Sequence, residues 1–361
     1  AGVAIGGSFF IPSITFIIGM ISATHPVISR HCGAGKKHLI PYDHAHAVLA
    51  SFIVGCIISL ILLYLAYFVI EMDSDKRMEQ TAIDYVIYIA YSMPVFALNN
   101  SARAFAEAMG NTRATLYFGV LAVVLNIPLN YIFIFGEYGM PELGGAGCGL
   151  ASMLSIFISC VVIYAYLMLH PKLKDYHCLK NKDGFSKQAL LSFFKLSLPL
   201  GISTSVEASC FSLIAIILSP LGSTQVSAHS ITMSLTNFVF NIPLSLGIAT
   251  AIMVGYAIGQ NNLESLKMNI KAAYASTIFT IVVSVSILLL GSHALPALFS
   301  DDPEVLALAT ALMFFAAFNQ SFEGIQTIQA FILRGFKDTT TILIVTFIAF
   351  YCVALPIGYS L

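Results

Sequence analysis

Ten long apolar stretches dominate the sequence, and short polar connections separate them. They fall near residues 1–29, 46–70, 82–109, 114–135, 146–169, 189–219, 225–258, 266–296, 304–333 and 340–361. A helix needs about 20 mostly apolar residues to cross the hydrocarbon core of a bilayer, and every stretch reaches that length. We therefore predict an all-α polytopic membrane protein that crosses the bilayer ten times.

The composition agrees with this class and excludes several others. Charged residues make up 10% of the chain, whereas soluble domains carry about 25%. The net charge of −1 gives no reason to expect a nucleic-acid partner. The seven cysteines lack CxxC or Cys/His spacing, so we predict neither a disulfide framework nor a metal–thiolate site. The glycine-rich run 144–149 follows no strand and no Walker motif is present, so we expect no nucleotide cofactor.

The longest polar connection, residues 170–187, separates two groups of five apolar stretches. We predict an amino-terminal lobe over 1–169, a linker over 170–188 and a carboxy-terminal lobe over 189–361. Fifteen of the 17 Lys and Arg residues fall on the side of the membrane that holds this linker. Because cytoplasmic loops carry the excess of positive charge, the linker is predicted to be cytoplasmic.

The two predicted lobes resemble each other. I-P-S at 11–13 matches I-P-L at 242–244, and N-I-P-L-N-Y at 126–131 matches A-L-P-I-G-Y at 354–359, at nearly the same separation. Each match joins stretches of the same predicted orientation. The pattern indicates a parallel repeat about an axis along the membrane normal, an arrangement common in transporters.

Glu207 is an isolated acid inside the sixth apolar stretch. Between Leu190 and Pro220 the only other charged residue is Lys195. A charge at the centre of a membrane helix costs about 2.5–3.5 kcal/mol on insertion scales, so such acids usually face a cavity or a partner. Ser203 and Thr204 precede Glu207 by one turn and share its face. The alternative is a protonated glutamic acid that hydrogen-bonds between packed helices.

Glu323 lies in a second polar segment. Its neighbours at helical spacing are Asn319, Gln320, Gln326 and Thr327. So many polar groups rarely face lipid, and we predict that they line an aqueous cavity; interhelical hydrogen bonding is the alternative. Two carboxylates can hold a small hard cation together with neutral oxygens, or they can share protons when burial and repulsion raise their pKa values.

Glu107 is interpreted differently, because Arg103 precedes it by one helical turn near the predicted cytoplasmic end. We predict an Arg103–Glu107 pair with a structural role. His25 and His229 are interpreted as packed or interfacial residues.

Several motifs resemble NorM-type transporters of the multidrug and toxic compound extrusion (MATE) family. They include F-I-P-S-I-T-F-I-I-G-M-I followed by H-C-G-A-G-K-K, S-P-L-G-S-T-Q-V-S-A-H, and I-L-R-G-F-K-D-T. The resemblance covers nearly the whole chain in one collinear order. It implies twelve helices in two lobes, of which this chain would hold the second to the tenth and most of the eleventh. The first helix, with its cation-coupling Asp, and the last would then be missing, as in a fragment.

The resemblance also implies a function. Members of this family expel cationic, amphipathic drugs across the bacterial inner membrane in exchange for Na⁺ or H⁺, and we expect a monomer. Glu207, eight residues after Pro199, matches the family's acid on helix seven, and Glu323 matches its acid on helix ten. An Asp is more usual at position 323 and a Tyr at 319, so the choice between Na⁺ and H⁺ stays open. Asn126 and Asn130 match polar residues of the amino-terminal cavity, with helix packing as the alternative.

Three other functions are alternatives to drug export. A lipid-linked-sugar flippase of the same superfamily shares the two-lobe plan but often lacks the paired acids. A polytopic membrane enzyme would need clustered catalytic His, Asp or Ser near one membrane face, and the sequence offers no such cluster. A channel would more often repeat a pore-lining element, whereas the polar groups here concentrate on two single helices.

Overall fold

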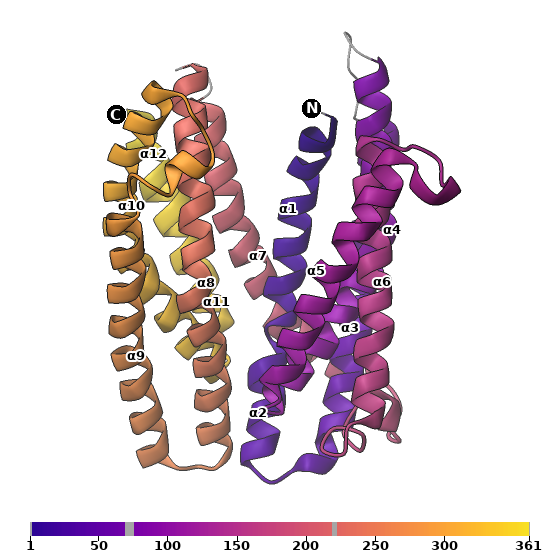
Figure 1. Ribbon diagram of the computed structural model, residues 1–361. Helices are drawn as coiled ribbons and strands as arrows, with labels where there is room; N and C mark the ends of the chain where they lie inside the picture. Colours follow the sequence, from indigo (N-terminus) through magenta and orange to yellow (C-terminus); the bar gives the residue numbers. More distant parts are fainter. Residues whose placement is uncertain (1, 69–75, 219–221, 361) are drawn as a thin grey trace. The chain divides into compact units, whose positions relative to one another are not determined.

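The computed structural model describes residues 2–68, 76–218 and 222–360, and all regular structure in these ranges is helical (Figure 1). Ten helical spans there are long and apolar enough to cross a membrane. The predicted stretch ends at 1, 70, 219 and 361 lie outside these ranges. The prediction of an all-α polytopic fold is confirmed. The long helices are α1 Gly2–Ile21, α2 Thr24–Gly33, α3 Ile40–Phe68, α4 Lys76–Ala108, α5 Thr112–Phe135, α6 Gly145–Leu169, α7 Lys187–Leu218, α8 Ser223–Gly259, α9 Leu263–Leu290 and α10 Pro303–Phe336.

The remaining elements are short. The tenth apolar stretch contains three of them in succession: α11 Thr339–Phe347, the π-helical segment η6 Ile348–Ala354 and α12 Leu355–Ser360. Within the described residues, short 3-10 helices lie in connections: η1 Lys37–Leu39, η2 Glu137–Gly139, η3 Cys178–Lys180 and η5 Pro296–Leu298.

The chain forms two compact units, which we call the first unit (residues 1–208) and the second unit (residues 209–361). The first unit holds α1 to α6 and most of α7, and the second holds the end of α7 and α8 to α12. The boundary between them therefore falls inside α7, just after Glu207. The lobes expected from the sequence, divided at 170–188, stay a prediction.

The first apolar stretch is not one continuous helix. α1 ends at Ile21 and α2 begins at Thr24, with a turn at Ser22 and Ala23. Pro26 explains the break, because it has no N–H to donate to the carbonyl of Ser22 four residues earlier. The carbonyl of Ser22 accepts instead from the main-chain N–H of His25, 3.3 Å away.

Several short connections end in a residue that caps the next helix. The side chains of Asn111, Asn262 and Asp338 each accept a hydrogen bond from a main-chain N–H in the first turn of α5, α9 and α11. Such caps satisfy N–H groups that have no partner within the helix. The three caps thereby fix where α5, α9 and α11 start.

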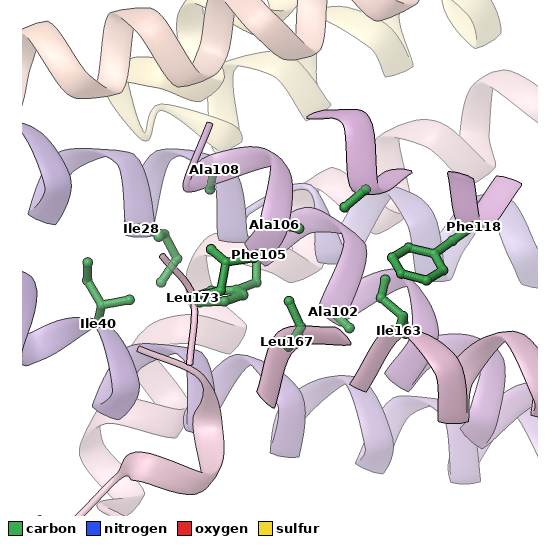
Figure 2. Close-up of a cluster of buried hydrophobic side chains, with 11 residues drawn as sticks. Ile28, Ile40, Ala102, Phe105, Ala106, Ala108, Phe118, Ile163, Leu167 and Leu173 are labelled. Atoms are coloured by element: carbon green, nitrogen blue, oxygen red, sulfur yellow. The ribbon is translucent and has the colours of Figure 1, made fainter. Parts of the chain in front are cut away.

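The core of the first unit gathers around Phe105 of α4 (Figure 2). Ile28 of α2, Ile40 of α3 and Leu167 of α6 pack in the same cluster. Leu173, from the connection between α6 and α7, is also a member and is fully buried. The connection thus contributes to the core that holds the helices.

The connection predicted as a linker is anchored to α3 as well. The main-chain N–H of Ser186 donates to Nε2 of His46 over 2.9 Å. The opposite nitrogen, Nδ1, lies 2.8 Å from the carbonyl of Tyr42, so Nδ1 carries the proton. The ring of Phe185 also meets the His46 ring edge-on. These contacts attach the connection to the first unit, which contains it.

The second unit is built on α8, α9 and α10, which pack on one another (Figure 1). α8 and α10 run parallel, because Gly247 of α8 abuts Phe331 of α10 and, further along both helices, Val254 abuts Gly335. A Cβ at either glycine would collide with its neighbour. Small residues here allow the two helices to approach closely, as in other membrane proteins.

Candidate cation and substrate site

Glu207 lies on α7, eight residues after Pro199, which is inside the same helix. Its side chain is half-buried, and Ser203, one turn earlier, is buried. Pro199 removes one main-chain hydrogen bond from the helix and favours a bend there. The carboxylate thus lies within a membrane-spanning helix that contains a proline about two turns earlier.

Thr204, predicted to share the polar face of Glu207, contacts α1. Its Oγ1 lies 3.0 Å from the main-chain carbonyl of Thr15 and 3.1 Å from that of Leu200. Gly19 permits the approach, because a Cβ there would overlap the Thr204 side chain. Thr204 therefore holds α1 against α7, whatever further role it has in a cavity.

The end of α7 packs against the π-helical segment η6. The hydroxyl of Tyr351 donates to Oγ of Ser209 over 3.1 Å. The rings of Phe211 and Phe350 meet edge-on beside this bond. Sequence reasoning missed Tyr351, because α-helical spacing does not predict a π-helical segment. Ser209 follows Glu207 by two residues, so this contact fixes the helix immediately after the acid.

The polar residues around Glu323 divide between two faces of α10. Asn319 and Gln326 are exposed, Glu323 is half-buried, and Gln320 and Thr327 are buried. Successive residues turn by about 100° around a helix, so neighbours in sequence can point to different surroundings. Asn319, Glu323 and Gln326 are therefore the more accessible residues of this set, whereas Gln320 and Thr327 are buried in the unit; the cavity stays a prediction.

Asn126 and Asn130 pair with each other on α5. The Nδ2 amide of Asn130 donates to Oδ1 of Asn126 over 2.7 Å, and both side chains are half-buried. An i,i+4 pair of this kind satisfies part of the hydrogen-bonding capacity of each amide. The two residues therefore act locally as one polar group.

Glu107 binds a residue that sequence spacing did not predict. Its Oε2 lies 2.9 Å from Nε2 of His25 on α2, and both side chains are largely buried. The ion pairs of the described ranges do not include the expected one with Arg103. Arg103 still acts on Glu107 electrostatically, but the prediction considered only neighbours on the same helix and missed the partner that packing of α2 on α4 supplies.

No group of three or more His, Cys, Asp or Glu side chains gathers within the described part of the chain. Glu207 belongs to the first unit and Glu323 to the second. A cation held by either carboxylate would therefore need hydroxyl, amide or main-chain oxygens as its other ligands. Such oxygens are the ligands that hard cations prefer.

The chain was compared with known proteins. The MatE family profile matches residues 1–132 and 199–360. The chain is 33% identical over 364 residues to "Multidrug resistance protein NorM" of Photobacterium profundum, covering 100% of this chain and 79% of the relative. It is 32% identical to "Multidrug resistance protein MdtK" of Edwardsiella ictaluri, with the same coverage. The solved structure "Crystal structure of MATE in complex with MaL6" superposes with a TM-score of 0.89 at 19% identity, over 99% of this chain and 80% of that one.

Proposed function

Since the chain belongs to the MatE family, a family of multi-pass membrane transporters and not of enzymes, we propose that it exports cationic, amphipathic drugs in exchange for Na⁺ or H⁺. Relatives that match 100% of this chain, and of which it covers 79%, are named as multidrug resistance proteins. The observation that carries the coupling proposal is a half-buried carboxylate within each of two membrane-spanning helices, Glu207 on α7 and Glu323 on α10.

The proposed mechanism is an exchange between two occupants. Glu207 and Glu323 would take up Na⁺ or a proton, and the loaded state would bind the drug less well. Antiport follows if the cation and the drug favour different conformations, because each then shifts the population away from the other. The exposed amides of Asn319 and Gln326 and the pair Asn126–Asn130 are the candidate polar contacts for the drug.

The setting of this activity is also part of the proposal. We place the protein in the bacterial inner membrane as a monomer, with the connection 170–187 in the cytoplasm. The lysines of that connection, such as Lys172, Lys174 and Lys180, support this orientation by the positive-inside rule.

The decisive experiment is drug efflux from proteoliposomes that contain the full-length protein. Ethidium or norfloxacin efflux is measured under a Na⁺ gradient alone and under a H⁺ gradient alone. We expect one gradient to drive efflux and the other to have little effect, which names the coupling ion. If neither gradient drives efflux, the antiporter proposal is wrong. Translocation of a lipid-linked sugar in the same vesicles would favour the flippase instead.

A further inference from the structure

The amide of Gln320 is buried in the second unit without a hydrogen-bond partner. Its side chain is 1% exposed, and neither Nε2 nor Oε1 is bonded within the described ranges. The same holds for the hydroxyl of Ser284 on α9, whose residue is 0% exposed. Buried polar side chains nearly always have a partner, either in the protein or in ordered water. Both groups therefore indicate an occupant.

Two contacts fix how α9 and α10 lie against each other. Near the joined ends, Oγ1 of Thr310 donates to the carbonyl of Ser292 over 3.1 Å. Further along, a Cβ on Gly324 would lie 2.8 Å from Cγ1 of Ile281. Both contacts fit one antiparallel register.

This register brings the two unpartnered groups together. Ser284 follows Ile281 by three residues along α9, and Gln320 precedes Gly324 by four along α10. Because the helices run in opposite directions, these steps move the same way along the bundle by about one turn each. Ser284 and Gln320 therefore lie at the same level on facing helices.

α8 supplies a third polar group at this level. Pro243 has no N–H, so the carbonyl of Val239 lacks the helical donor that residue 243 would otherwise provide. Val239 and Pro243 are both buried. α8 and α10 run parallel, and Gly247 of α8 lies against Phe331 of α10. Two turns earlier on α8, Val239 therefore faces the turn of α10 that begins with Gln320.

We propose that Gln320, Ser284 and the carbonyl of Val239 bind one buried water molecule between α8, α9 and α10. Buried waters typically make about three hydrogen bonds to groups that would otherwise be unsatisfied. The water accepts from Nε2 of Gln320 and donates to the Val239 carbonyl and to Oγ of Ser284. A cation fits this set less well, because all three groups are neutral and the amide also presents N–H donors.

The water site goes beyond the proposed transport function and does not depend on it. It joins three helices through a single exchangeable molecule in place of direct side-chain bonds. Glu323 follows Gln320 by three residues, so the water supports the turn of α10 on which the acid lies.

The direct test is a structure of the full-length protein in lipid nanodiscs at a resolution that shows ordered water. We expect a water within hydrogen-bond distance of the Gln320 amide and of Oγ of Ser284. A direct bond between these two side chains, or a site without water, would overturn the proposal.

A double-mutant cycle tests the shared occupant through stability. Ser284→Ala and Gln320→Leu should each lower Tm, and together they should lower it by less than the sum, because both remove the same water. Thr277→Val is the matched control on α9, since its hydroxyl donates to the carbonyl of Ala273 within its own helix. Thr277→Val and Gln320→Leu should therefore be additive. Additivity of Ser284→Ala with Gln320→Leu, or a rise in Tm from either single change, would contradict a water site.

Discussion

Glu107 and Glu207 are both carboxylates on membrane-spanning helices of the first unit, but their surroundings differ. Glu107 is paired with His25 of a second helix at 2.9 Å. Glu207 follows a proline-interrupted segment that carries hydroxyl groups, among them Thr204. An acid with a basic partner on another helix ties two elements together, whereas an acid that follows a helix proline and hydroxyl-bearing residues lies where a cation could be exchanged. We therefore propose a stabilising role for Glu107 and a coupling role for Glu207.

The largest effect should come from removing the proposed coupling carboxylates. Glu207→Gln and Glu323→Gln should each abolish ethidium efflux in the full-length protein while membrane expression persists, because the amide cannot carry the exchanged charge. Glu264→Gln, at the exposed start of α9, is the matched control and should retain efflux. Normal efflux from both variants would mean that neither carboxylate is needed for coupling, and Glu207 would then no longer differ from Glu107 in its role.

Breaking the buried pair should chiefly affect stability. His25→Ala leaves the Glu107 carboxylate buried without its partner, and loss of one member of a buried pair costs about 3–5 kcal/mol. We expect a lower thermal midpoint in nanodiscs, with efflux per folded molecule retained. His229→Ala, at a half-buried histidine of α8, should have a smaller effect. Loss of efflux without a change in the thermal midpoint would indicate that Glu107 takes part in coupling.

Asn126 and Asn130 provide an intermediate case, because their shared bond is within one helix. Asn130→Ala removes the donor to Oδ1 of Asn126 and should cost about 1 kcal/mol. A binding role predicts in addition a raised KM for drug efflux. Asn241→Ala on α8, where an exposed asparagine bonds its own helix, controls for the general loss of an amide. An unchanged KM would leave the pair with a packing role alone.

The smallest expected effect concerns His177, a buried histidine outside the membrane spans. Burial lowers its pKa below the ordinary 6.5, Lys180 acts in the same direction and Asp175 opposes it. His177 thus favours the neutral form. The unfolded segment then binds more protons between the lowered pKa and 6.5, so packing of the connection is fully stable above pH 6.5 and weakens as the pH falls below it.

Hydrogen exchange of residues 170–187 measures this pH dependence. After correction for intrinsic exchange, protection should fall between pH 7.5 and pH 5 in the parent protein. His177→Gln should remove the pH-dependent part. A pH dependence that persists in this variant would belong to another group.

Much of the fold could be predicted because membrane helices leave a strong pattern. Long apolar runs and the excess of Lys and Arg on one side depend only on composition along the chain, and all ten spans were found this way. The break between α1 and α2 and the π-helical segment were missed. Both depend on main-chain hydrogen bonds, which the distribution of apolar residues along the chain does not reveal.

The site was only partly predictable for a related reason. Spacing along one helix singled out Glu207 and Glu323 as candidates, since an isolated acid in an apolar run is visible in the sequence. It did not reveal the bond between Glu107 and His25, because His25 is 82 positions away in the chain. It also combined Gln320 with Asn319, although the structure turns one inward and leaves the other exposed. Partners from other helices require the packing itself.

The π-helical segment at Ile348–Ala354 holds more residues per turn than the α-helices on either side. Its main chain therefore contains a register slip, which means that the segment holds in effect one residue more than an α-helix with the same number of turns. Shifting that slip along α11 and α12 would rotate the residues it passes by about 100° without melting the helix. Tyr351 lies inside the slip and bonds Ser209, two positions beyond Glu207. A ratchet of one residue in this helix would thus release the backbone next to the acid.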